Sequence, residues 1–142
     1  MADSPVGLLA WIYEALHDWV DEYKWTDDEI LTWISIYYFS KPGPAASSLV
    51  YWAIEHREVN AFAASAAYSD VPIGISRFAG DLLLLPKLWN HTLGPVVFEK
   101  DHDKGGHFAS WEHPEAIVED LRAMFGKKGG AYDVVKDKSG FA

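Results

Sequence analysis

Residues 105–115, GGHFASWEHPE, decide how this chain is organised. Two glycines precede His107, and glycine permits the backbone conformations that a tight turn requires. Pro114 follows closely, and proline is favoured in the first turn of a helix. The stretch therefore predicts a glycine-rich turn that presents His107 between a strand and a helix. An imidazole held in this way suits acid–base catalysis, because it changes charge near neutral pH. The alternative is a loop histidine that makes only local hydrogen bonds.

The residues on either side of this turn predict the end of an α/β layered fold. Short strands are expected at 71–76 and 95–99, with a loop between them that is ended by Pro86. A final helix is expected from Pro114, and its apolar face is made of Ile117, Val118, Leu121, Met124 and Phe125. A parallel sheet must be covered on both faces. Two strands and one helix cannot close such a fold, so the fold is expected to be incomplete.

The first 55 residues predict three helices. Ser4 is a suitable N-cap for a helix that continues to about residue 21, and Thr26 with Glu29 fits a capping box. Residues 30–39 are apolar almost all round, which predicts a helix buried on most sides. The sequence KPGP at 41–44 breaks the chain before a shorter helix at 45–55.

Composition limits the function classes. A net charge of −9 argues against nucleic acid and against anionic membrane surfaces, since both attract lysine and arginine. The absence of cysteine, of a signal peptide and of an apolar run of about 20 residues favours a cytoplasmic protein. The heavy aromatic load, seven each of Trp, Tyr and Phe, is expected to fill the core for the most part and to line a cavity in places.

Asp81 is the candidate partner of His107. It follows the first predicted strand and precedes His107 by 26 positions. In hydrolases of the α/β type, the acid and the histidine lie on successive strand-end loops, and the acid holds the imidazole in its useful tautomer. A helix-capping or solvated aspartate is the alternative. Asp70, Asp101 and Asp103 compete for the role, but Asp101 and Asp103 are expected on the histidine's own loop.

Three further patterns bear on chemistry. Tyr51, near Tyr37, Tyr38 and Trp52, could donate its phenolic hydrogen to a developing oxyanion from a helix above a pocket.

The run 101–103 (DHD) with His107 has the residue types of a metal site, but these residues crowd one loop, and we expect no metal. The sequence contains neither a Gly-x-Ser-x-Gly nor a Gly-x-Asp-x-Gly nucleophile elbow, and it contains no phosphate-binding glycine loop.

Four stretches carry a resemblance to a known family: DSPVGLLA at 3–10, PAASSLVY at 44–51, Asp81 with PKLW at 86–89, and GGHFA at 105–109 with EHPE at 112–115. Together they resemble the C-terminal part of epoxide hydrolases of the microsomal type, which have the α/β-hydrolase fold. The resemblance covers residues 2 to about 125. It implies a helical lid segment at 1–62, the last two parallel strands and final helix of the core at 63–126, and a flexible tail at 127–142.

The resemblance also implies roles. His107 corresponds to the base that activates water, Asp81 to the charge-relay acid, and Tyr51 to one of two lid tyrosines that polarise the epoxide oxygen. Leu49 stands where the family often has arginine. The implied reaction opens an epoxide through an ester intermediate to a vicinal diol, with a small apolar epoxide and water as substrates and with no metal or organic cofactor.

The family's elbow aspartate and other lid tyrosine correspond to positions before Met1. The chain is therefore expected to be inactive alone and to self-associate through exposed core surface. Another α/β-hydrolase, an esterase or dehalogenase, and a non-catalytic truncated product are the alternatives.

Overall fold

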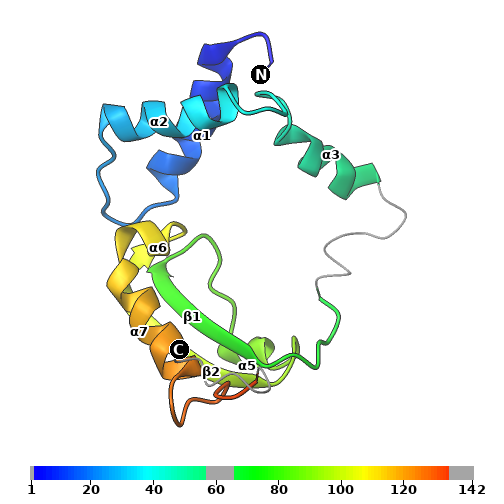
Figure 1. Ribbon diagram of the computed structural model, residues 1–142, viewed down its shortest axis with the longest axis vertical. Helices are drawn as coiled ribbons and strands as arrows, with labels where there is room; N and C mark the ends of the chain where they lie inside the picture. Colours follow the sequence, from blue (N-terminus) through cyan, green and yellow to red (C-terminus); the bar gives the residue numbers. More distant parts are fainter. Residues whose placement is uncertain (1, 57–65, 135–142) are drawn as a thin grey trace. The chain divides into compact units, whose positions relative to one another are not determined.

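The chain forms two compact units in a computed structural model, which describes residues 2–56 and 66–134 (Figure 1). Unit 1 consists of Met1–Trp19 and Tyr23–Ala66, and unit 2 consists of Val20–Glu22 and Ala67–Ala142. Unit 2 thus takes in three residues from the connection between the first two helices. The predicted boundary between residues 62 and 63 lies outside the described residues.

Unit 1 contains the three predicted helices, α1 (Pro5–Asp18), α2 (Asp27–Tyr38) and α3 (Ser48–His56). Ser4 Oγ accepts the Gly7 N–H at 3.1 Å, and the Thr26–Glu29 capping box has both of its hydrogen bonds, which confirms both predicted caps. Helix α1 ends at Asp18, before the predicted end near residue 21, and Trp19 is its C-cap. Helix α3 begins later than predicted, since residues 45–47 form a turn.

The core of unit 1 is small and aliphatic. Leu8, Ile12 and Leu16 of α1 and Ile34 of α2 are its buried residues in the described part of the chain. The prediction that residues 30–39 are buried on most sides is wrong. Ile34 is the buried residue of α2, whereas Leu31, Ile36 and the C-cap residue Phe39 are exposed. The expectation of an aromatic core is also wrong. Phe78 of unit 2 is the one aromatic side chain among the buried residues that the structure describes.

Unit 2 is built on two parallel strands, β1 (Ile73–Gly80) and β2 (Val96–Gly106), as predicted. Two short helices, α5 (Lys87–Asn90) and α6 (Ala109–Glu112), follow the strands, and α7 (Pro114–Phe125) is the predicted final helix. Both strands extend further than predicted. Asp101 and Asp103 therefore lie within β2 and not on the loop of His107, which corrects the sequence-based expectation.

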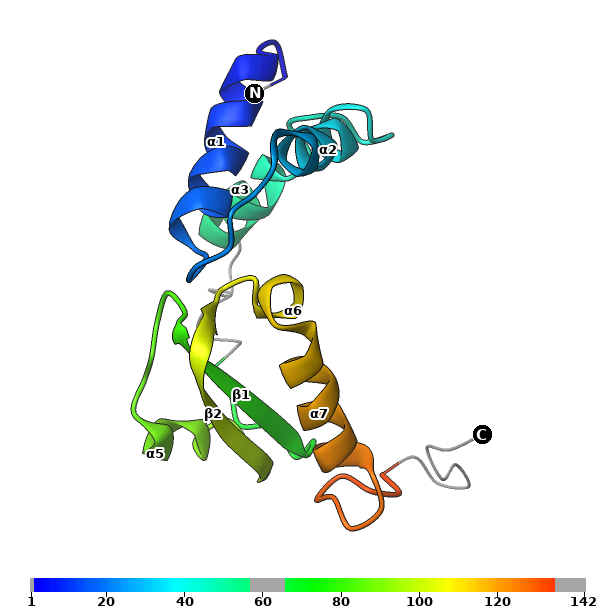
Figure 2. The ribbon, with the colours of Figure 1, turned by 90° about the vertical axis from the view of Figure 1, so that its left-hand side faces the viewer.

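Helix α7 packs along one side of the strand pair, and α5 lies at the other side (Figure 2). Met124 is buried against Gly74, where an added Cβ would lie 2.3 Å from the methionine sulfur. The predicted apolar face of α7 is only partly buried, since Val118, Leu121 and Phe125 stay exposed. A sheet of two strands is too narrow to cover the whole face.

The predicted tail begins with more structure than the sequence indicated. Residues 126–134 form successive turns, Ala131 donates to Met124 O at 3.0 Å, and Ala131 is buried. Gly130 lies so close to Val97 that an added Cβ would be 2.4 Å from its carbonyl oxygen. These residues thus pack on the start of β2, and 135–142 lie outside the described residues. Among the described helices, none has the length and apolarity needed to cross a membrane.

Candidate active site

Asp81 and His107 lie together at the carboxyl ends of the two strands. Gly80 and Gly106 are paired in the sheet, and each is followed by one of the two candidate residues. His107 Nδ1 is 2.9 Å from Asp81 Oδ1, which confirms the predicted contact. The same oxygen accepts the N–H of Leu82 at 2.7 Å, so the backbone fixes the orientation of the carboxylate. An imidazole that donates from Nδ1 to a carboxylate has the arrangement of a general base with its orienting acid.

The pair is accessible to solvent. The His107 side chain is 44% exposed and the Asp81 side chain is 38% exposed. Water can therefore reach the imidazole in unit 2.

The turn before His107 depends on glycine. The strand register shifts between Phe78 and Gly80, so β2 uses more residues than β1 to reach the paired ends. Gly105 has a φ of +104°, in the region that side chains disfavour, and an added Cβ would lie 2.8 Å from Phe78 Cδ1. The unusual backbone path predicted from the two glycines is confirmed at Gly105.

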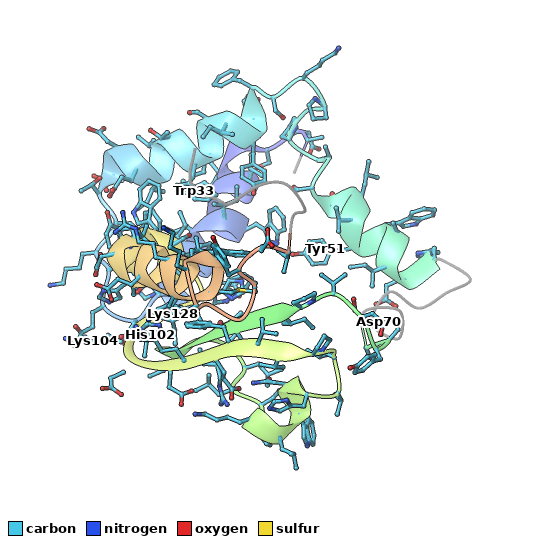
Figure 3. All side chains as sticks on the ribbon, turned by 60° about the horizontal axis from the view of Figure 1, so that its bottom comes forward. Trp33, Tyr51, Asp70, His102, Lys104 and Lys128 are labelled. Atoms are coloured by element: carbon cyan, nitrogen blue, oxygen red, sulfur yellow. The ribbon has the colours of Figure 1, made fainter. Side chains whose placement is uncertain are left out.

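The competing aspartates are placed elsewhere. Asp70, which Figure 3 labels, precedes β1, whereas Asp81 follows it, so the two residues belong to opposite ends of the strand. Asp101 forms ion pairs with Lys87 and, at 3.5 Å, with Arg77. The hydrogen bond from Lys87 lowers the pKa of Asp101 below its usual value. Asp101 is thereby engaged on the α5 side of the strands.

The metal-type residues at 101–103 do not lie together on the loop where the sequence analysis expected them. Along β2, Asp101 contacts Lys87 of α5 whereas His102 contacts Asp120 of α7, because successive side chains of a strand point to opposite faces. Within residues 2–56 and 66–134, no three His, Cys, Asp or Glu side chains are grouped as metal ligands.

A buried polar cluster around Asp120 was missed by sequence reasoning. Asp120 Oδ2 accepts from Ser76 Oγ and lies by His102 Nε2, both at 2.6 Å, and Lys100 Nζ is 3.1 Å from Oδ1. The His102 ring stacks on Phe78 with centroids 4.5 Å apart. Burial raises the pKa of Asp120, but the hydrogen bonds from Ser76, His102 and Lys100 outweigh it and hold the pKa below its usual value.

This cluster ties α7 to both strands. Asp120 is 3% exposed and bonds to Ser76 of β1 and His102 of β2. The position of Asp120 in the helix is a signal in the sequence for this burial. At spacings of three and four residues, Asp120 shares a helix face with the apolar residues Ile117 and Met124. A carboxylate on an apolar face needs partners there.

Tyr51 lies on α3 in unit 1. Its ring meets Trp11 edge-to-face at 6.1 Å, and its side chain is half exposed (Figure 3). A half-exposed phenol is available to a ligand. Because Tyr51 and His107 belong to different units, the lid role of Tyr51 stays a prediction.

Comparisons with known proteins agree on one family, although no family model matches the chain. The chain is 36% identical over 131 residues to a protein of Stigmatella aurantiaca named "Putative epoxide hydrolase" and 31% identical over 137 residues to epoxide hydrolase 1 of Sus scrofa. These matches cover 88% and 87% of this chain.

Solved structures give the same result. Aspergillus niger epoxide hydrolase matches 86% of the chain with a TM-score of 0.66 and 34% identity, and an enantioselective mutant of it matches with the same TM-score and 35% identity. The chain spans 28% of the length of the Stigmatella protein and 30% of the others. In sequence and in fold, this chain is similar over most of its length to the C-terminal portion of epoxide hydrolases, and it carries that portion of the α/β-hydrolase fold.

Proposed function

We propose that Asp81 and His107 form the water-activating pair of an epoxide hydrolase, which converts an epoxide to a vicinal diol. The observation that carries the proposal is the 2.9 Å contact between His107 Nδ1 and Asp81 Oδ1 at the paired strand ends. The names of the similar proteins support the choice of epoxide over other substrates of this fold.

The proposed reaction has two steps. A carboxylate oxygen attacks an epoxide carbon, the ring C–O bond breaks, and the oxygen that leaves takes a proton from a tyrosine such as Tyr51. The product is an ester with a neighbouring hydroxyl group. His107 Nε2 then removes a proton from water, the hydroxide attacks the ester carbonyl, and the ester C–O bond breaks. The acid proton passes to the departing diol oxygen, which restores the carboxylate, and the imidazolium returns its proton through solvent to the tyrosinate left by the first step. Asp81 stabilises the imidazolium that forms in this second step.

A run of four exposed leucines lies next to Asp81 in the sequence. Leu82, Leu83, Leu84 and Leu85 directly follow Asp81, and each is at least 42% exposed. An apolar surface beside the base favours an apolar epoxide over a charged one.

The nucleophile must be supplied for the test. Neither nucleophile-elbow motif occurs in the 142 residues, so the isolated chain is expected to form no diol. We would therefore place residues 2–125 in the Stigmatella aurantiaca relative, in exchange for its matching segment, and assay the chimaera with an aryl epoxide.

The chimaera is expected to release diol, and its His107→Ala variant is expected to stop after the first step. Mass spectrometry of that variant should show a covalent adduct whose added mass equals that of the epoxide, because ring opening adds the whole substrate. Diol release from the His107→Ala variant at the parent rate would refute the proposal, as would a folded, cooperatively melting chimaera that forms neither diol nor adduct.

A further inference from the structure

We propose that Asp21 and Glu112 are positioning residues for His107, acting as a carboxylate clamp on the backbone of the turn that presents it. The proposal rests on the proposed function of His107, but the clamp is defined by contacts within unit 2. Sequence reasoning assigned no role to either residue.

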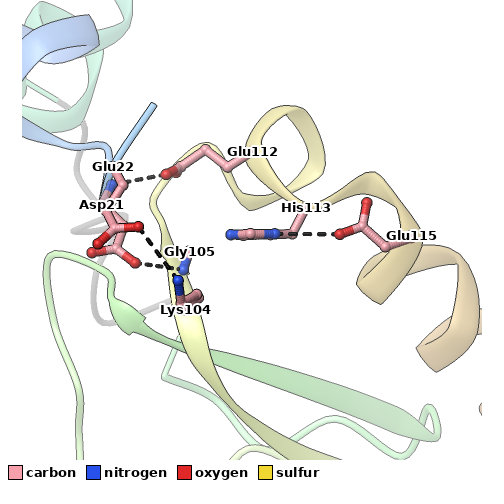
Figure 4. Close-up of polar contacts among 7 residues, drawn as sticks. All are labelled: Asp21, Glu22, Lys104, Gly105, Glu112, His113 and Glu115. Carbon is pink, nitrogen blue, oxygen red and sulfur yellow. Dashed lines mark hydrogen bonds and ion pairs between the residues drawn. The ribbon is translucent and has the colours of Figure 1, made fainter. Parts of the chain in front are cut away.

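The clamp consists of three hydrogen bonds, and Figure 4 draws the two that involve Asp21. The Gly105 N–H donates to Asp21 Oδ2 at 2.9 Å, and the Gly106 N–H donates to Glu112 Oε1 at 2.9 Å. The second Glu112 oxygen, Oε2, accepts the Asp21 N–H at 2.8 Å. The two carboxylates therefore hold the two amides that directly precede His107, and Glu112 also holds Asp21 in place.

The turn needs such a clamp because its two glycines do not restrict their own backbone conformation. Gly105 and Gly106 have no side chains, so steric contacts leave many backbone conformations open to them. Both glycines are buried, and a buried amide without an acceptor is costly. The hydrogen bonds to Asp21 and Glu112 satisfy these amides and select one backbone path.

Asp21 also touches the strand end that carries Asp81. A Cβ added to Gly80 would lie 3.0 Å from Asp21 Cβ and 3.0 Å from the Gly105 oxygen. Asp21 thus packs against the residue before Asp81 while bonding the turn before His107. The clamp is placed to fix the spacing between the acid and the base.

The neighbouring ion pair is a weaker contact. Lys104 Nζ lies 3.5 Å from Glu22 Oε2, and both side chains are mostly exposed. Exposed ion pairs contribute little because water screens them. The clamp therefore acts through hydrogen-bond acceptors and not through net charge.

This distinction predicts a specific order among variants. Asp21 accepts one hydrogen bond, so Asp21→Asn keeps an acceptor whereas Asp21→Ala loses it. Glu112 accepts with both oxygens, so Glu112→Gln keeps one acceptor and Glu112→Ala keeps none. A charge effect would instead make Asp21→Asn as harmful as Asp21→Ala.

The experiment follows His107 directly in the full chain labelled with ¹⁵N-histidine. Long-range ¹H–¹⁵N spectra report which ring nitrogen is protonated, and His107→Ala assigns the signal. Asp81→Ala supplies the reference spectrum for an unoriented ring. Glu119→Gln is the matched control, because it removes one carboxylate from the exposed surface of α7.

The His107 signal is expected to move towards that of Asp81→Ala in Asp21→Ala and Glu112→Ala, partly in Glu112→Gln, and not in Asp21→Asn or Glu119→Gln. Amide exchange at Gly105 and Gly106 should accelerate about tenfold in the two alanine variants, in line with the loss of one hydrogen bond at each amide. If Glu112→Ala fails to fold by circular dichroism, Glu112→Gln and Asp21→Ala carry the comparison.

An unchanged His107 signal in folded Asp21→Ala and Glu112→Gln would overturn the clamp. Identical His107 signals in the parent and in Asp81→Ala would also overturn it, because the parent ring would then not be oriented by Asp81. These spectra require no turnover, so a failed clamp is distinguishable from a failed diol or adduct assay.

Discussion

Gly80 and Gly106 are partners in the register of two parallel strands, and this pairing brings Asp81 and His107 within hydrogen-bond distance. The carboxyl ends of adjacent parallel strands share one edge of a sheet, where α/β proteins build their sites.

Gly105→Ala should destabilise unit 2 by about 2–4 kcal/mol, because the positive φ and the close contact with Phe78 each oppose a side chain. Urea unfolding measures the effect. In a double-mutant cycle with Phe78→Leu, the steric part should be relieved and the strain of the positive φ should remain. Simple additivity of the two substitutions would show that the ring does not restrict Gly105.

Asp120 should make unit 2 sensitive to acid. Its pKa is lower in the folded chain than the value of about 3.9 for an unfolded aspartate, so its contribution to stability is present above that pH and is lost as the pH falls through the folded pKa. The free energy of unfolding of the parent should therefore fall more steeply below about pH 4 than that of Asp120→Asn. Urea unfolding at several pH values measures both.

Glu119→Gln is the control for this acid effect, because Glu119 is an exposed neighbour on the same helix. It should leave the pH dependence close to that of the parent. Identical slopes for the parent and Asp120→Asn would contradict the assigned role of Asp120.

Tyr51→Phe should slow ring opening in the chimaera by about 10²–10³-fold, because the leaving alkoxide loses a proton donor. The rate of adduct formation in the His107→Ala background measures this step alone. Tyr37→Phe and Tyr38→Phe remove the same hydroxyl from α2 and should leave the rate unchanged. A Tyr51→Phe variant that forms adduct at the parent rate would remove Tyr51 from the mechanism.

The chain should associate with itself through the apolar residues that follow β1. Leu83 is 70% exposed and Leu88 is 78% exposed, and exposed apolar surface of this kind favours association. Sedimentation velocity should show species that grow with protein concentration, and Leu83→Glu with Leu88→Glu should reduce them. A parent chain that stays monomeric over the same concentrations would count against this surface.

Local patterns in the sequence were sufficient to predict much of this fold. Ser4 and the Thr26–Glu29 box set helix starts through contacts within a few residues, and such contacts are visible in sequence. The partnership of Asp81 with His107 could be predicted because parallel strands align their ends.

Features that depend on distant contacts could not be predicted. Several apolar residues of α2 and α7 are exposed because few other residues pack on these helices. The periodicity of apolar residues indicates which face of a helix is apolar, but not how much of that face is covered. Asp21 and Glu112 are 91 positions apart, and the backbone N–H of Asp21 donates to the side chain of Glu112. The partners of Asp120 could not be predicted, because Ser76 is 44 positions away and His102 is 18 positions away.

The central claim is that a carboxylate at position 81 enables His107 to activate water, and the breakdown of the ester intermediate tests it most directly. In single turnovers of the chimaera, followed by mass spectrometry, Asp81→Asn should slow the decay of the adduct by about 10²–10⁴-fold while its formation is unchanged. Asp81→Glu, which keeps the charge, should retain much of the rate. Decay of the adduct in Asp81→Asn at the parent rate would contradict the account.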